Sequence, residues 1–141
     1  MATLLVSDPI FLEHLVPSGH PERPDRLRAI ERALADDAFA ALIRRDAPTP
    51  ASVETIATAH DESYIALIRD NVPAEGFTRL DADTTLSPKS YLAAARAVSA
   101  AVLATDAVMG RTVSNALCAV RPPGHHAEPD RPWASACSAM P

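Results

Sequence analysis

The stretch ALCAVRPPGHH, residues 116–126, decides how this sequence is expected to fold. Residues 116–120 are a continuous apolar run, which is typical of a strand buried inside a parallel sheet. Two prolines then hold the backbone extended, and Gly124 permits a turn just before His125 and His126. Because active sites in open α/β sheets gather at the carboxyl ends of strands, the two histidines are the first candidate site.

The rest of the chain supplies strands and helices in an order that favours an α/β layered fold. An apolar run at residues 3–6 predicts a further strand. Residues 43–47 are interpreted as another short strand. Helical spacing or flanking capping residues predict helices over residues 25–38, residues 50–59, the residues that follow Asp61, and residues 88–110. About three strands can be counted, against the roughly five or six of a typical sheet, so the parallel sheet is expected to be incomplete.

Composition indicates a folded globular protein and disfavours several classes of partner. Of 141 residues, 48% are hydrophobic and 22% are charged. The net charge of -5 disfavours nucleic acid as a partner. Arg96 and Asp106 interrupt the most apolar window, so no membrane span is expected. Cys118 and Cys137 form no disulfide framework or CxxC pair, which predicts a reducing, cytoplasmic location.

His125 and His126 suit proton transfer better than joint metal binding. On a regular strand, adjacent side chains point to opposite faces and would not hold one ion together. In a turn, they can converge on a substrate or a water molecule. Histidine titrates near neutral pH, which favours general acid–base chemistry. The alternative interpretation is a surface turn with two solvated imidazoles.

The segment RPPGHHAE, residues 121–128, resembles the signature of the histone deacetylase superfamily, which includes acetylpolyamine amidohydrolases and acetoin-utilisation proteins. Three further segments that resemble family motifs occur in the matching order: residues 19–27, residues 60–65 and residues 81–91. The resemblance covers residues 1–131. It implies the N-terminal part of the arginase/deacetylase-like three-layer α/β fold around a parallel sheet, incomplete here.

The resemblance implies a zinc-dependent amidohydrolase that removes acetyl groups from acetyl-lysine or acetylpolyamines. His125 and His126 match the family's tandem catalytic histidines, Asp83 an acidic substrate-binding residue at the tunnel rim, and Arg26 an arginine of the internal channel. The family takes its zinc ligands from an Asp-x-His segment and another Asp downstream of the tandem histidines. None of those ligands occurs in this chain, so it is expected to bind no zinc and to be inactive alone. Without the family, loop capping would explain Asp83 and a solvated helix charge would explain Arg26.

Residues 132–141, PWASACSAMP, depart from the family, which continues here with a segment such as AMGFCLFSNA. Loss of one base from codons for that segment yields PWASACSAM followed by proline. We therefore predict that residues 132–141 are an out-of-frame tail that begins after Arg131, so that Trp133 and Cys137 carry no function. Nucleotide reads across the Arg131 codon test this hypothesis.

Two other interpretations stay open. One is a non-catalytic, truncated interaction module that associates through an exposed sheet edge with a partner that supplies the missing strands. The other is a metal site built from His125, His126 and other local histidines. The remaining three histidines, His14, His20 and His60, are expected to be structural, capping or exposed. The oligomeric state and the preferred acyl group are left open.

Overall fold

A computed structural model describes residues 2–82, 84–124 and 127–130. Asp83, His125, His126 and the predicted out-of-frame tail lie outside these described residues. The elements in chain order are β1 (Thr3–Ser7), the 3-10 helix η1 (Pro9–Leu12), α1 (Pro24–Leu34), the 3-10 helix η2 (Asp37–Phe39), β2 (Ile43–Asp46), α2 (Val53–Ile56), α3 (Glu62–Asp70), β3 (Thr78–Arg79), β4 (Thr85–Leu86), α4 (Ser90–Met109) and β5 (Asn115–Cys118).

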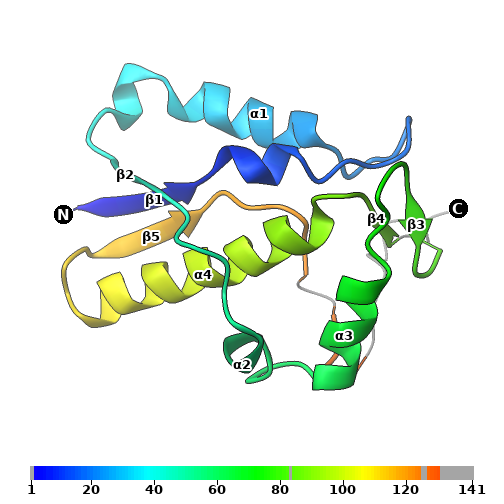
Figure 1. The fold of residues 1–141 in the computed structure, drawn as a ribbon. Helices are drawn as coiled ribbons and strands as arrows, with labels where there is room; N and C mark the ends of the chain where they lie inside the picture. The colour runs from blue at the N-terminus through cyan, green and yellow to red at the C-terminus, as the bar shows by residue number, and fades with distance from the viewer. Residues whose placement is uncertain (1, 83, 125–126, 131–141) are drawn as a thin grey trace, which may run out of the picture.

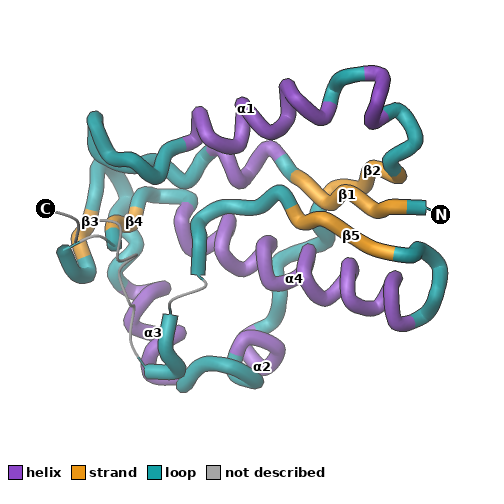
Figure 2. Tube along the Cα trace, turned by 180° about the vertical axis from the view of Figure 1, so that it is seen from behind, coloured by secondary structure: helices purple, strands orange, loops and turns teal. Residues whose placement is uncertain are grey.

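The principal sheet has three parallel strands in the order β2-β1-β5. Its register places Leu5 of β1 opposite Arg44 of β2 on one side and Leu117 of β5 on the other. Helices α1 and α4 lie on opposite sides of this sheet (Figures 1 and 2). The expected α/β fold with a parallel sheet is therefore confirmed.

The core forms around the central strand β1 because its apolar residues have neighbours on every side. Leu4, Leu5 and Val6 are buried, and Phe11 and Leu27 close over them from η1 and α1. The opposite side is covered by small residues of α4, namely Ala93, Ala100 and Ala104. Short alanine side chains let a helix approach the sheet closely.

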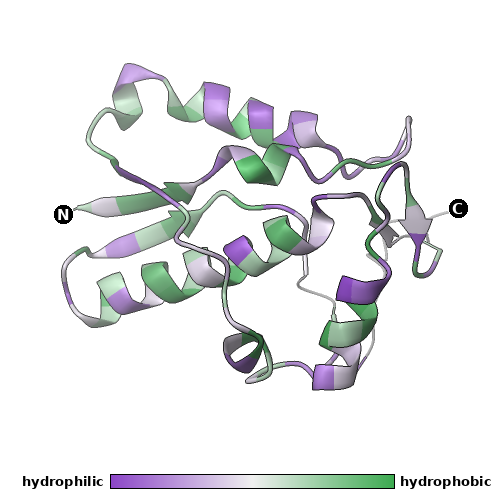
Figure 3. Cartoon of the chain, in the orientation of Figure 1, coloured by the Kyte–Doolittle hydropathy of each residue, from purple (hydrophilic) through white to green (hydrophobic). Residues whose placement is uncertain are grey.

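Helix α4 differs in character from α1. Figure 3 shows strongly hydrophilic residues at several positions of α1, whereas α4 is mostly hydrophobic or neutral. By length and composition alone, α4 is the one helix among residues 2–82, 84–124 and 127–130 that could cross a membrane. In this fold it packs against β5, β1 and η1, which is the position of a core helix.

Ala100 tests how tightly α4 packs on the sheet. It is fully buried, and its carbonyl oxygen lies 3.5 Å from the Cys118 Sγ of β5. Ala100→Leu is expected to lower the free energy of unfolding by about 1–3 kcal/mol, because a larger side chain has no space there. Urea unfolding measures the loss. Ala101→Leu, on the exposed side of the same helix, is the control and should change stability by less than about 0.5 kcal/mol. Equal effects of the two variants would contradict close packing.

A partly buried ion pair joins the N-cap of η1 to α4. Arg96 Nη1 donates to Asp8 Oδ2 at 2.5 Å, and Asp8 Oδ1 accepts from the backbone N–H of Ile10 at 2.9 Å. Asp8 is therefore both the cap of η1 and the partner of a cation on α4. The Arg96 that interrupts the apolar pattern of α4 in the sequence is thus paired through Nη1, whereas its Nε is buried without a hydrogen-bond partner among the described residues.

Two predicted helices are shorter in the structure. The predicted helix over residues 25–38 ends at Leu34, because the Asp36 side chain accepts from Ala38 N and begins η2. Arg44 of β2 also donates to the carbonyl oxygen of Leu34, which caps the last turn. Of the predicted helix over residues 50–59, only Val53–Ile56 is helical. The residues before it are bonded to α4 instead, since Ala51 N–H donates to Ala95 O at 3.1 Å.

A short antiparallel pair, β3 and β4, was not anticipated from the sequence. Thr78 lies opposite Leu86, and Arg79 lies opposite Thr85. Each strand has two residues, too few to show an alternating pattern. Both residues of β4 are buried, so this hairpin belongs to the folded body next to the start of α4.

Candidate active-site loop

The candidate loop begins where β5 ends and runs from Arg121 to Glu128. The structure describes its two ends, up to Gly124 and from Ala127 onward. His125 and His126 lie between those ends, outside the described residues. The described geometry therefore concerns how the fold holds the loop on either side of the tandem histidines.

Arg121 ties the upstream end of the loop to the N-terminal part of the chain. Its side chain is buried, with 4% of the residue exposed. Nε donates to Glu22 Oε1 at 2.6 Å and Nη2 donates to Glu22 Oε2 at 2.8 Å, a bidentate ion pair. Nη1 donates to two backbone carbonyl oxygens, of Phe11 at 2.8 Å and of His14 at 3.0 Å. The guanidinium group is thus satisfied by three separate residues.

The downstream end is tied to the start of α3. His60 Nδ1 donates to the carbonyl oxygen of Glu128 at 3.1 Å, and Asp61 N–H donates to the carbonyl oxygen of Pro129 at 2.8 Å. Because a carbonyl oxygen only accepts, His60 carries its proton on Nδ1 in this contact. The sequence pattern His60-Asp61 that resembles a family motif therefore docks the segment after the tandem histidines.

The two ends of the loop also meet each other. Ala127 N–H donates to Gly124 O at 2.9 Å, a hydrogen bond that spans the two undescribed residues. The bond closes the backbone across three residue steps, which is the span of a tight turn.

His14 lies beneath the loop in a buried polar network. Its Nδ1 is 2.7 Å from Ser90 Oγ, and Ser90 Oγ is 3.1 Å from Ser87 Oγ. Ser87 Oγ in turn accepts from Leu15 N–H at 2.9 Å. These contacts join the segment after η1 to the start of α4. His14 is structural here, as the sequence analysis expected.

His14 is neutral near pH 7 despite an acidic neighbour. Its Nε2 lies 3.7 Å from Glu22 Oε2, close enough for an ion pair if the imidazole were protonated. Burial, however, lowers the pKa of His14 to about 4; Glu22 acts in the opposite sense, while Arg121 and His20 lower the pKa further. Desolvation outweighs the attraction of Glu22, so the contact is not an ion pair at neutral pH.

This pKa predicts acid sensitivity. Between the ordinary value of 6.5 and the folded value of about 4, the unfolded chain binds a proton that the folded chain does not. Stability conferred by neutral His14 is therefore complete above pH ~6.5 and is lost as the pH falls toward ~4, by roughly 3 kcal/mol in all. Urea unfolding at several pH values in this window should show a steeper pH dependence for the native chain than for His14→Asn. Equal slopes would contradict the prediction.

The other two candidate residues lie on separate elements. Arg26 is in the first turn of α1, where its side chain is exposed. Asp83 lies outside the described residues. Of its described neighbours, Asp81 accepts from Thr84 N–H at 2.7 Å and from Thr84 Oγ1 at 2.9 Å. Burial, and secondarily the charge of Asp81, raises the pKa of Tyr64 on α3. The channel role of Arg26 and the substrate role of Asp83 remain predictions.

The described residues do not form a metal centre. Among residues 2–82, 84–124 and 127–130, no group of three His, Cys, Asp or Glu side chains could hold a metal ion. Cys118 carries a free thiol, and burial raises its pKa, which disfavours the thiolate that metals bind. The described side chains therefore do not fit a zinc ion.

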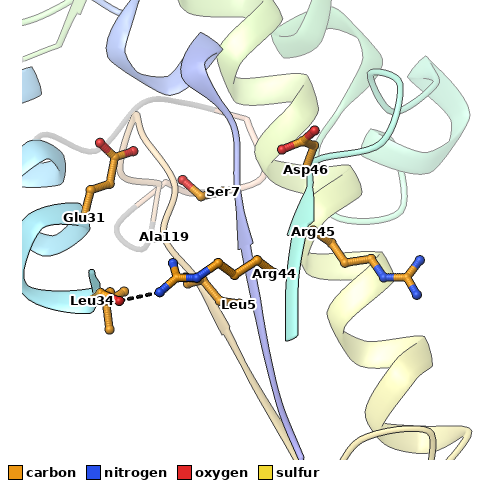
Figure 4. Close-up of a pocket in the computed structure, with 8 residues that line it drawn as sticks. All are labelled: Leu5, Ser7, Glu31, Leu34, Arg44, Arg45, Asp46 and Ala119. Carbon is orange, nitrogen blue, oxygen red and sulfur yellow. Dashed lines mark hydrogen bonds between the residues drawn. The ribbon is translucent and has the colours of Figure 1, made fainter. Parts of the chain in front are cut away.

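A separate hollow lies between α1 and the sheet. Figure 4 shows this cavity of about 300 Å³ with Glu31 and Leu34 of α1 on one side and residues of β1 and β2 on the other. Ser7 Oγ is buried there without a hydrogen-bond partner among the described residues. Arg26, the predicted functional residue that the structure describes, does not line this cavity, and neither do the described ends of the candidate loop.

Sequence reasoning missed the roles of Glu22 and Arg121. Both residues stand inside segments that resemble family motifs, but those segments alone assign neither of them a role. The available signal was charge: an arginine directly after a buried apolar strand must find an acidic partner if it is buried too. Nothing in the sequence shows which of the 18 acidic residues that partner is.

Comparison with known proteins shows which family has segments like those around the candidate loop. Residues 20–133 match the histone deacetylase domain family. The chain is 32% identical over 114 residues to a histone deacetylase-like amidohydrolase of Pseudomonas aeruginosa, covering 81% of this chain and 30% of that protein. It is 30% identical to the human polyamine deacetylase HDAC10, covering 79% of this chain and 18% of that protein.

The structural comparison agrees. The crystal structure of the HDA15 HD domain superposes with a TM-score of 0.82 at 31% sequence identity, covering 94% of this chain and 38% of that one. The chain therefore spans well under half of each of these relatives. The family match, which includes the segments that hold the candidate loop at both ends, shows that the chain belongs to the histone deacetylase domain family.

Proposed function

We propose that this chain is the N-terminal part of a deacetylase that hydrolyses the acetyl-amide of acetyl-lysine or of an acetylpolyamine. The observation that supports this best is the loop of residues 121–128, which is tied at Arg121 to the N-terminal segment and at Glu128 to α3. A general acid–base pair must be held within hydrogen-bond reach of the reacting atoms, and such ties supply that constraint. The relatives named as an amidohydrolase and a polyamine deacetylase support the substrate class.

Within this proposal, the roles of the residues follow the resemblance. His125 and His126 move protons between the attacking water and the leaving amine. Asp83 holds the substrate at the tunnel rim, and Arg26 lines the internal channel. A cytoplasmic location and an out-of-frame origin of residues 132–141 are proposed alongside.

In this proposal, only the complete family enzyme binds zinc. When bound, it polarises the amide carbonyl and lowers the pKa of a water molecule. The described residues offer no set of three ligands for it. We therefore propose that the 141-residue chain does not hydrolyse acetyl-amides by itself.

An assay of the purified chain with zinc and an acetyl-lysine peptide, and separately with an acetylpolyamine, tests this proposal. No hydrolysis above the zinc-only blank is expected, while the Pseudomonas aeruginosa relative serves as the positive control. A His125→Ala/His126→Ala variant is the matched control for the chain. Hydrolysis that a chelator abolishes and that this variant lacks would overturn the proposed inactivity and place a complete site within the chain.

One observation favours the interaction module as a second candidate. In the described part of the chain, β5 pairs only with β1, and Leu117 of β5 is 46% exposed. An open strand edge can pair with another chain. Size-exclusion chromatography distinguishes the outcomes: a discrete complex supports the module, whereas a monomer or an aggregate argues against it.

A further inference from the structure

A chain of buried polar side chains joins the segment after η1 to the start of α4. His14, Ser87 and Ser90 are 5%, 0% and 1% exposed. His14 Nδ1 lies 2.7 Å from Ser90 Oγ, which lies 3.1 Å from Ser87 Oγ. Two backbone donors have a fixed direction: Leu15 N–H donates to Ser87 Oγ at 2.9 Å, and Ser87 N–H donates to Ser90 Oγ at 2.7 Å. The protons left to place are those of the two hydroxyl groups and of the imidazole.

Among the described residues, one direction of this chain uses every hydroxyl proton. If neutral His14 carries its proton on Nε2, Ser87 Oγ–H donates to Ser90 Oγ, and Ser90 Oγ–H donates to His14 Nδ1. If the proton were on Nδ1, His14 would donate to Ser90, and Ser90 would donate to Ser87. The Ser87 hydroxyl proton would then be buried without an acceptor in the described part of the chain. Because an unpaired buried donor is unfavourable, neutral His14 is an acceptor at Nδ1.

Three charged or titratable groups face the imidazole. Its Nε2 lies 3.7 Å from Glu22 Oε2, so a proton on Nε2 has a carboxylate beside it. Glu22 favours a second proton on the ring, whereas burial, Arg121 and His20 disfavour it, and the pKa of His14 is lowered to about 4. That second proton would go on Nδ1. It would reverse the bond to Ser90 and leave the Ser87 hydroxyl without an acceptor.

We propose that His14, Ser87 and Ser90 form an acid-sensitive latch between the segment after η1 and the start of α4. With His14 neutral, the bonds run from Ser87 through Ser90 to Nδ1, and the latch is closed. A proton on Nδ1 reverses them, and the two segments separate while the rest of α4 stays folded. Opening also weakens the hold on Arg121, since Arg121 Nη1 donates to the carbonyl oxygen of His14 at 3.0 Å. The latch is a property of the fold and does not rest on the proposed deacetylase function.

Substitution of a histidine by asparagine separates the charge from the hydrogen bond. In His14→Asn, the amide oxygen can accept from Ser90 as Nδ1 does, but the side chain does not titrate. His20→Asn is the matched control, because His20 also lies next to Glu22, where its Nδ1 accepts from Glu22 N–H at 3.1 Å. Ser90→Ala is the second test variant. It removes the donor to Nδ1, so the ring should titrate closer to its ordinary value of 6.5.

The experiment uses the complete 141-residue chain labelled with ¹⁵N and two NMR readouts. The first is the pair of ring nitrogen chemical shifts of His14 at pH ~7, which are expected to show the proton on Nε2. The second is hydrogen exchange of the Leu15 and Ser87 amides between pH ~6.5 and ~4.5, corrected for the intrinsic rate at each pH. Ala104, buried in the middle of α4, is the reference amide. In the native chain, protection of Leu15 and Ser87 should fall about tenfold relative to Ala104 over this range.

The variants should divide into two groups. His14→Asn is expected to keep both amides protected throughout the range, whereas His20→Asn should open as the native chain does. A proton on Nδ1 at pH ~7, or the same pH dependence in His14→Asn, would overturn the proposal. Loss of Leu15, Ser87 and Ala104 protection together would also overturn it, because the chain would then unfold as a whole. If His14→Asn does not fold, Ser90→Ala decides: the latch must open at a higher pH than in the native chain, and an unchanged opening pH rejects it.

Discussion

Glu22→Ala is expected to destabilise the fold by about 3–5 kcal/mol, the largest effect of any single charge removal in this chain. The reason is that the buried Arg121 guanidinium would lose both of its charged contacts, at 2.6 Å and 2.8 Å, and would stay buried without a counter-charge. The carbonyl oxygens of Phe11 and His14 would remain as its only partners. Urea unfolding monitored by circular dichroism measures the change.

An exposed ion pair in the same region provides the control. Asp25 pairs with Arg28 at 2.9 Å, but their side chains are 65% and 49% exposed. Asp25→Ala is therefore expected to cost less than about 1 kcal/mol, because water screens such pairs and solvates the remaining charge. If Glu22→Ala lowered the free energy of unfolding by no more than Asp25→Ala does, the buried Arg121–Glu22 ion pair would not be a major source of stability.

Phe11→Ala is expected to lower the free energy of unfolding by about 3–5 kcal/mol. The cause is lost packing and not a lost charge, so the effect is independent of that of Glu22→Ala. Phe11 is fully buried in η1, where it packs against the central strand and α1 within the core cluster. Alanine would leave a cavity among Leu5, Val6 and Leu27 that a rigid three-layer packing cannot close. The same urea experiment measures it.

Phe39→Ala is the matched control for the core substitution. Phe39 lies in η2 and is 41% exposed, so its removal should change stability by less than about 1 kcal/mol. Small domains are stable by only about 5–15 kcal/mol, so either large substitution alone removes much of the folded population at moderate urea. A Phe11→Ala chain as stable as Phe39→Ala would show that η1 is not part of the cooperative core.

The sequence predicted the elements whose signals are local. The apolar run of β1 and the long alanine-rich segment of α4, which ends at Gly110, place these two elements by pattern alone. The apolar run at residues 116–120 also predicts a strand, but its interior position was wrong: β5 is an edge strand of the described sheet, and none of Asn115–Cys118 is buried. The ends of α1 and α2 were misjudged because side chains from distant elements decide them. Arg44 caps Leu34, and Ala95 of α4 takes the N–H of Ala51.

The candidate site was predictable as a motif and not as a geometry. The order of residues 121–126 indicates a loop at the end of a strand, and the structure places residues 121–124 after β5. The pairing of Arg121 with Glu22 joins positions 99 residues apart, and no local pattern encodes a contact of that length. The contact of His60 was not predictable either. Its partner is the backbone carbonyl oxygen of Glu128, and every residue has such an oxygen.

The place of β1 in the middle of the sheet has a consequence for synthesis on the ribosome. The first strand to emerge pairs with β2 on one side, but its other neighbour, β5, is translated only after α4. Throughout that interval a nascent chain holds an apolar strand with one edge unsatisfied, which is the kind of surface that holdase chaperones bind. Parallel pairing between such distant segments is also slow to form. We therefore expect the yield of folded protein to depend on translation speed through residues 50–115.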